Sequence, residues 1–192
     1  MPTRERGSRG MGKEIIQMKI SLDGIRPQIW RRFIVESSIS LERLHEIIQI
    51  VMGWENCHLY SFSIGGDEAS KKMTLKELGL REKETIGYIY DFGDNWEHAI
   101  VVEKIASSDK KIITPRCLAG ARNCPPEDCG SIPGYEDIVE AMKKPKSRKA
   151  REYIEWLGDI YNPAKFDISE INNNLKEATE IKKEMIKKGE DR

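Results

Sequence analysis

Two strand-like segments separated by a short run of turn-forming residues constrain the fold of this chain most. Apolar side chains recur with a strand-like spacing in residues 86–92 and 96–105, and Gly93, Asp94 and Asn95 lie between the two segments. Alternation with a period of two residues is typical of a half-buried β-strand. Gly, Asp and Asn are also the residues that tight hairpin turns require. The sequence therefore predicts an antiparallel β-hairpin at this point.

The length of the turn leaves two registers of this hairpin open. With a four-residue loop, Asp91 stands opposite His98 and forms a carboxylate–imidazole pair suited to general base chemistry. With a three-residue loop, Asp91 opposes Glu97 and His98 opposes Tyr90. Either register predicts a polar ligand-binding surface beside aromatic side chains, and its candidate residues are Asp91, Asp94, Trp96 and His98. The alternative is a structural hairpin, in which the Asp and Asn residues only make the turn.

Strand patterns dominate the first part of the chain and helical patterns the last. We expect further strands at 16–22, 29–35 and 59–64, a helix between Ser40 and Gly53, and a short helix near Leu75 and Leu78. Helical patterns follow at residues 135–142, 153–157 and 168–181. Because strands and helices do not alternate, the order predicts an α+β fold: an antiparallel-rich mixed sheet, helices packed on it, and a helical C-terminal third.

Charge and hydropathy narrow the classes of partner. The chain has 32 Lys and Arg residues against 32 Asp and Glu residues, so no net charge attracts nucleic acid or an anionic membrane. We find no apolar stretch long enough to span a bilayer and no signal peptide, and we therefore expect a cytoplasmic protein without a membrane partner. We divide it into a disordered tail (1–12), a single domain (13–182) and a charged, frayed C-terminus (183–192).

Three cysteines lie in a loop rich in Pro and Gly, with the spacing C-x6-C-x4-C. Cys117, Cys124 and Cys129 could supply three thiolates to zinc, with His98, His58 or Cys57 as the fourth ligand. The spacing lacks the C-x2-C pair of structural zinc sites, and the alternative is a rigid loop whose thiols are small apolar groups. We expect no cofactor, and zinc is the alternative.

Two cationic segments are further candidates. Arg26, Arg31 and Arg32, beside Trp30, could bind a phosphate or carboxylate. The structural alternative pairs these arginines with carboxylates such as Asp91 or Glu97 across the sheet. The basic run at 143–151 could contact a nucleic acid backbone, although it contains no interleaved aromatic residues.

Five segments of the sequence, in this order along the chain, together resemble a known family. They are ISLDGIRPQIWRRF, LHEIIQIVMGWENCHLYSFSIGG, YDFGDNWEH, CLAGARNCPPEDCGSIPGY and FDISEIN. The chain is thereby similar to the plasmid pRiA4b ORF-3-like family, also labelled as insertion-element passenger proteins of the TnpR type, over residues 15–175. The resemblance implies a single α+β domain encoded near mobile elements, and it implies no particular chemistry. The motifs of serine and tyrosine recombinases are not found in this sequence.

The sequence favours a non-enzymatic binding or interaction module, whose surface includes the hairpin and the cysteine loop and whose partner is a protein or a small ligand. The first alternative is a metal-dependent hydrolase or nuclease that uses Asp91, Asp94 and His98 as ligands or base. The second is a nucleic-acid-binding accessory protein of a mobile element.

Overall fold

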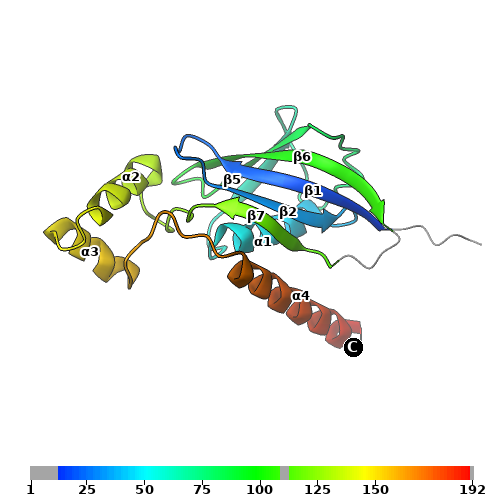
Figure 1. The fold of residues 1–192 in the computed structure, drawn as a ribbon. Coiled ribbons are helices and arrows are strands. Elements are labelled where there is room, and N and C mark those ends of the chain that lie inside the picture. The colour runs from blue at the N-terminus through cyan, green and yellow to red at the C-terminus, as the bar shows by residue number, and fades with distance from the viewer. Residues whose placement is uncertain (1–12, 109–112, 191–192) are drawn as a thin grey trace, which may run out of the picture.

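A computed structural model describes residues 13–108 and 113–190 of the chain. Its centre is a seven-stranded sheet with the strand order β4-β3-β5-β6-β1-β2-β7, and every strand pairing is antiparallel. The strands are β1 (Lys13–Leu22), β2 (Trp30–Glu36), β3 (Tyr60–Ile64), β4 (Asp67–Glu68), β5 (Thr85–Tyr90), β6 (Trp96–Ser108) and β7 (Arg116–Ala121). Helices stand beside and beyond the sheet (Figure 1), so the α+β prediction is confirmed.

Alternation along the strands separates a buried face from a polar one. In β1, Met18 and Ile20 are fully buried, whereas Lys19 lies on the other face with its ammonium group over the ring of Trp30. Helix α1 (Leu41–Met52) supplies eight of its twelve residues to the buried side. Its ends follow the expected caps, because the Ser40 side chain accepts from the N–H of Arg43 and Gly53 adopts the left-handed conformation.

The β5–β6 hairpin forms, but with neither expected register. Tyr90 pairs with Trp96 and Tyr88 pairs with His98, so the loop has five residues, from Asp91 to Asn95. Asp91 and Asn95 both have positive φ, and the N–H of Asn95 donates to the carbonyl of Asp91. Asp91 therefore does not stand opposite His98, because the longer loop pairs His98 with Tyr88, three residues before Asp91.

Two other local predictions differ from the structure. The start of the cysteine segment forms the edge strand β7, which pairs with β2. Its outer edge is covered by Asn172, whose side chain accepts from the Cys117 N–H and donates to the Cys117 carbonyl. The segment around Leu75 and Leu78 makes hydrogen-bonded turns instead of a helix, with Thr74 and Glu77 hydrogen-bonded to each other.

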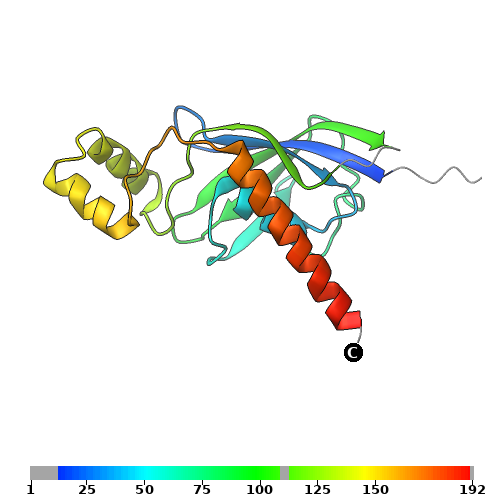
Figure 2. The same cartoon turned by 60° about the horizontal axis from the view of Figure 1, so that its bottom comes forward.

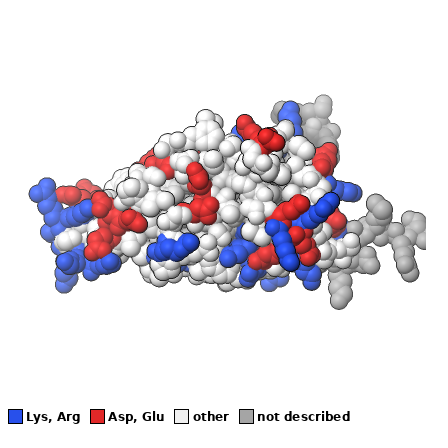
Figure 3. Space-filling model, turned by 90° about the horizontal axis from the view of Figure 1, so that it is seen from above, with Lys and Arg blue, Asp and Glu red and all other residues white. Residues whose placement is uncertain are grey.

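Helices α2 (Ser131–Met142) and α3 (Arg148–Leu157) form a hairpin beyond one end of the sheet (Figures 1 and 2). This hairpin contains the basic run at 143–151. Lys143 pairs with Glu140 and Lys149 pairs with Asp137. Cations and carboxylates consequently lie side by side at this end of the molecule (Figure 3), and the surface is mixed in sign instead of uniformly basic.

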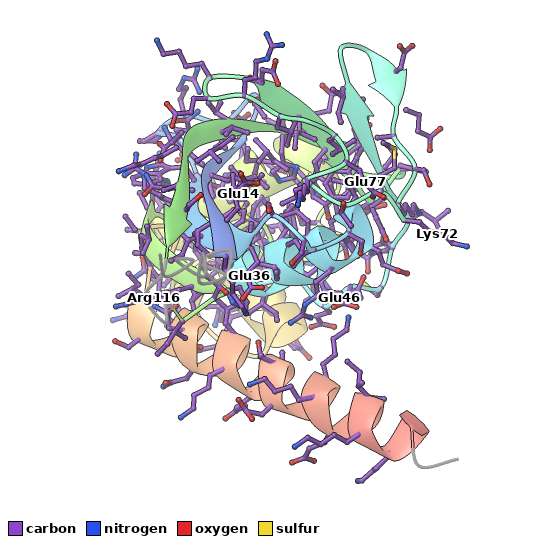
Figure 4. All side chains as sticks on the ribbon, turned by 90° about the vertical axis from the view of Figure 1, so that its right-hand side faces the viewer. Glu14, Glu36, Glu46, Lys72, Glu77 and Arg116 are labelled. Carbon is purple, nitrogen blue, oxygen red and sulfur yellow. The ribbon has the colours of Figure 1, made fainter. Side chains whose placement is uncertain are left out.

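Helix α4 (Ile168–Glu190) crosses beside α1 and β7, and its last turns extend past the sheet (Figure 2). Leu175 is buried against the body, whereas Ile181 and Met185 are exposed. Lys182 donates to both carboxylate oxygens of Glu46 on α1, at 3.0 and 2.8 Å, and Figure 4 shows Glu46 on the side of α1 that faces α4. The helix thus continues through residues 183–190; residues 191 and 192 lie outside the described part, as does the predicted tail at 1–12.

Candidate metal centre

Three connecting segments meet at the end of the sheet nearest to α2 (Figure 1). They are the segment between α1 and β3, the β5–β6 turn, and the segment between β7 and α2. The N–H of Asp91 donates to the Leu59 carbonyl at 2.9 Å, which joins the first two segments. The indole N–H of Trp54 donates to the Pro125 carbonyl at 3.0 Å, which joins the first and the third. Side chains from three distant parts of the sequence are thereby brought to one place.

His58 lies at the centre of this junction and faces carboxylates on both sides of its ring. Its Nδ1 is 3.8 Å from Oδ1 of Asp91. Its Nε2 is 3.8 Å from Oε2 of Glu127 and 3.2 Å from Oδ1 of Asp128. The ligand atoms of His58, Asp91 and Asp128 all lie within 4.8 Å of one another, and so do those of His58, Cys57 and Glu127. In the part of the chain that the structure describes, these are the two groups of this kind.

Two of these atoms are buried without a hydrogen-bond partner. They are Nε2 of His58 and Oε2 of Glu127, and the contact between Nε2 and Asp128 does not meet hydrogen-bond geometry. Buried polar atoms in native proteins are almost always paired with protein, water or an ion. The two unpaired atoms face one another, so this position can accept a further group between them.

Glu127 is held firmly by its other oxygen. Its Oε1 accepts from the Tyr90 hydroxyl at 2.9 Å and from the Glu55 backbone N–H at 2.8 Å. The Tyr90 oxygen in turn accepts from the Cys57 N–H at 3.2 Å. Burial, followed by the hydrogen bond to Glu127, raises the pKa of Tyr90. Tyr90 therefore remains a protonated donor, and Glu127 presents an unpaired Oε2 toward His58.

Three residues in or next to the cluster around His58 have a left-handed backbone although they are not glycine. Asn56 precedes Cys57 and His58, while Asp91 and Asp128 belong to the cluster, and their φ angles are 58, 55 and 54°. Asn and Asp tolerate this conformation better than most residues do, yet it remains uncommon. Such conformations cluster at functional sites, where neighbouring contacts hold them in place. Asp91 is held by the Gly93 N–H, which donates to its Oδ1 at 2.9 Å.

Of the four residues predicted on the hairpin, one belongs to this cluster. Asp91 contacts His58, whereas Asp94 accepts a hydrogen bond from the Gly130 N–H at 3.1 Å and so anchors the start of α2. Trp96 and His98 are buried in the core, where the Trp54 ring meets His98 edge-on at 5.2 Å. Burial lowers the pKa of His98 to about 4, and the imidazole is neutral.

The three predicted arginines have structural contacts, and Arg31 donates to four backbone carbonyls. Arg32 forms a bidentate ion pair with Glu103 at 2.6 and 2.7 Å and stacks over Trp30. Pairing across the sheet is thus the observed arrangement, although we expected Asp91 or Glu97 as its partner. Arg26 donates to the adjacent carbonyl of Ile25.

The three cysteines considered as zinc ligands are not brought together as a ligand set. Cys117 points inward from β7 and its thiol donates to the Ala119 carbonyl, while the Cys129 thiol is directed at the Ser131 carbonyl. Burial is the main cause that raises the pKa of all three thiols, that of Cys129 to about 12. The thiols are therefore protonated, and they lie apart because β7 places Cys117 in the core.

Sequence reasoning missed Glu127 and Asp128, and it considered His58 only as an extra ligand for the cysteines. The signal that could have found them is weak: His58 follows a helix, and the two carboxylates are adjacent in the Pro-Pro-Glu-Asp run. The described residues contain no helix that is both long and apolar enough to cross a membrane.

Comparison with known proteins places the chain among relatives of similar length. Protein y4hQ of Sinorhizobium fredii (strain NBRC 101917 / NGR234), described as uncharacterized, is 33% identical over 177 residues. The match covers 84% of this chain and 91% of that protein. The crystal structure of MM3350 from Methanosarcina mazei Go1, a protein of unknown function, is similar with a TM-score of 0.75 and 33% identity, over 83% of this chain and 98% of the other. The model of the plasmid pRiA4b ORF-3-like proteins matches residues 14–170, and the chain therefore belongs to that family.

Proposed function

We propose that the chain is a metal-binding module that takes a divalent transition-metal ion between His58, Glu127 and Cys57. The observation that carries the proposal is the pair of buried, unpaired atoms, His58 Nε2 and Glu127 Oε2, that face each other at 3.8 Å. A tetrahedral ion with bonds of about 2.0–2.1 Å holds its ligand atoms roughly 3.3 Å apart. The separation from Nε2 to Oε2 of Glu127, 3.8 Å, is close to that value, and the Cys57 thiol lies within 4.8 Å of both residues.

Asp91 fits the role of the group that orients the histidine. An imidazole that binds metal through Nε2 carries its proton on Nδ1, and in protein sites that proton is commonly donated to a carboxylate. Asp91 lies on the Nδ1 side, is buried, and is itself fixed by the Gly93 N–H. A small rotation of either side chain would shorten the 3.8 Å contact to a hydrogen bond.

The donor set favours zinc or another first-row transition ion over magnesium and calcium. Imidazole nitrogen is a typical ligand of the former, whereas the latter two ions select oxygen atoms. The thiol of Cys57, the third donor of this set, has the same preference.

Isothermal titration of metal-depleted protein with Zn²⁺, Co²⁺ and Mg²⁺ tests the proposal. We expect one Zn²⁺ or Co²⁺ per chain, no binding of Mg²⁺, and loss of binding in His58→Ala and Glu127→Gln. Asp91→Asn should weaken the affinity about 10- to 100-fold, because it keeps the shape but removes the orienting charge. Asp94→Asn is the matched control, since Asp94 lies in the same turn and outside the cluster. The proposal is wrong if the wild type binds no ion, or if the control loses as much affinity as Glu127→Gln.

A second candidate function is hydrolysis by the bound ion. The Asp128 side chain is 71% exposed, so the cluster opens to solvent and a metal-bound water would be reachable by a substrate. Such an ion lowers the pKa of its water to about 7, which supplies hydroxide at neutral pH. Zinc-loaded wild type should then cleave a nitrophenyl ester or phosphodiester, and Glu127→Gln should not. Metal binding without turnover of either substrate leaves the binding module as the function.

A further inference from the structure

A second polar network lies beneath the segment that carries Cys57 and His58. Its members are His45 and Gln49 on α1, Tyr88 on β5 and Asn56 in the segment itself. The first three are almost completely buried, whereas Asn56 is exposed. The network therefore joins the core to a loop residue two positions before His58.

The hydrogen bonds form a closed ring in which each donor is defined. The Asn56 Oδ1 can only accept, so His45 carries its proton on Nε2 and donates it at 2.6 Å. The Asn56 backbone N–H donates to Gln49 Oε1 at 2.9 Å, and the Gln49 amide donates to the Tyr88 oxygen at 3.0 Å. The Tyr88 hydroxyl then donates to Nδ1 of His45 at 2.8 Å. A ring in which all bonds run in one direction is cooperatively strengthened.

His45 is suited to hold this ring in a single arrangement. Its imidazole is stacked on Tyr60, with 3.5 Å between ring centroids and 8° between ring planes, so the direction of both nitrogens is fixed. Burial lowers the pKa of His45 and keeps the imidazole neutral. A neutral imidazole with its proton on Nε2 can accept at Nδ1, which the hydrogen-bond ring requires. Asn56, at the other side of the ring, has φ of 58° and turns the chain into Cys57 and His58.

We propose that His45 is a positioning residue for the metal centre: through Asn56 it fixes the left-handed turn that directs His58 toward Glu127 and Asp128. The effect of His45 on metal affinity rests on the proposed metal-binding function. The ring of hydrogen bonds itself does not require a metal.

Long-range ¹H–¹⁵N correlation spectra of the metal-free protein test the ring directly. We expect the His45 signals of a neutral imidazole protonated at Nε2. Protonation at Nδ1 would overturn the inference, whatever the protein binds, because Nδ1 could then not accept from Tyr88.

Three variants test the consequence for the metal. His45→Phe keeps the ring that stacks on Tyr60 and removes both nitrogens, and Asn56→Gly keeps the left-handed turn and removes the acceptor. We expect each to bind Zn²⁺ about 10- to 100-fold more weakly and to change the visible spectrum of bound Co²⁺. Asn56→Asp retains both the acceptor and the turn, and it should bind within about threefold of the wild type.

The outcomes separate the two proposals. A wild type that binds no Zn²⁺ removes the metal-binding function and with it the role of His45. Normal Zn²⁺ affinity and an unchanged Co²⁺ spectrum in His45→Phe and Asn56→Gly would overturn only the positioning role. If His45→Phe does not fold, Asn56→Gly decides, since its side chain is exposed and its backbone conformation is one that glycine adopts readily.

Discussion

Arg31 is a buried cation whose removal should destabilise the fold strongly. The residue is 2% exposed, and no carboxylate in the described part of the chain pairs with it. Its Nε donates to the Val51 carbonyl at 2.7 Å, Nη1 donates to Trp30 and Ala121 at 2.8 and 2.9 Å, and Nη2 donates to Arg122 at 2.8 Å. It thus links the last turn of α1 to the end of β7, where the segment carrying Glu127 begins.

The expected cost of Arg31→Met follows from two opposing effects. Methionine retains much of the apolar stem but leaves four carbonyls without this donor, and each hydrogen bond to a charged group contributes about 1.5–3 kcal/mol. The variant no longer buries a charge, which returns several kcal/mol. We expect a net loss of about 3–5 kcal/mol in the free energy of unfolding, because the hydrogen bonds lost at four carbonyls outweigh the burial of charge that is removed. For a domain of this size the melting temperature would fall by roughly 6–20 °C.

Urea denaturation of Arg31→Met and Arg32→Met measures the difference. Arg32 is the matched control, because it is the next residue and bonds a carboxylate on the solvent side, with 34% of its side chain exposed. Its loss should cost about 1 kcal/mol or less. The reasoning is refuted if the two variants are equally stable, or if Arg31→Met unfolds at the same urea concentration as the wild type.

Two further stability measurements follow from buried groups. Because the pKa of His98 is about 4 in the folded chain and near 6.5 when unfolded, its contribution is complete above pH 6.5 and is lost as the pH falls toward 4. The free energy of unfolding falls by about 3 kcal/mol over this range. Denaturation curves at several pH values should show a flatter pH dependence of this free energy for His98→Gln than for the wild type. The same pH dependence in both proteins would contradict the prediction. Leu175→Ala should cost about 2–5 kcal/mol because this side chain is buried. Ile181→Ala, on the exposed part of the same helix, should cost under about 0.5 kcal/mol, and equal losses would disprove the docking of α4.

The fold could be predicted from sequence because its signals are periodic and local. The apolar and polar residues that alternate in β1 lie on the buried and the polar face of the sheet. Ser40 and Gly53 cap α1, as their residue types indicate. Strand β7 was missed because its residues Arg116–Ala121 have no such alternation of large apolar side chains. Its position depends on pairing with β2 and on the Asn172 side chain, which are contacts between distant parts of the chain.

The predicted register of the hairpin was wrong for a related reason. Gly93, Asp94 and Asn95 are the residues that turn rules recognise, and they predicted a shorter loop. The actual loop begins at Asp91, whose side chain accepts from the Gly93 N–H and stabilises a left-handed backbone. Asp can adopt this conformation, but sequence alone does not reveal where it will, because Asp serves equally well in a strand end or a turn.

The left-handed backbone also explains why sequence reasoning found only one part of the candidate metal centre. Its residues lie between secondary-structure elements, where no period relates one to the next, and left-handed Asn56, Asp91 and Asp128 decide where the side chains point. Asp91 therefore has two separable roles, one in the backbone of the turn and one as the carboxylate beside His58. Asp91→Asn keeps an acceptor for the Gly93 N–H and removes only the charge, whereas Asp91→Ala removes both. A loss of metal affinity that is already complete in Asp91→Asn would assign the role to the charge, and a loss confined to Asp91→Ala would assign it to the turn.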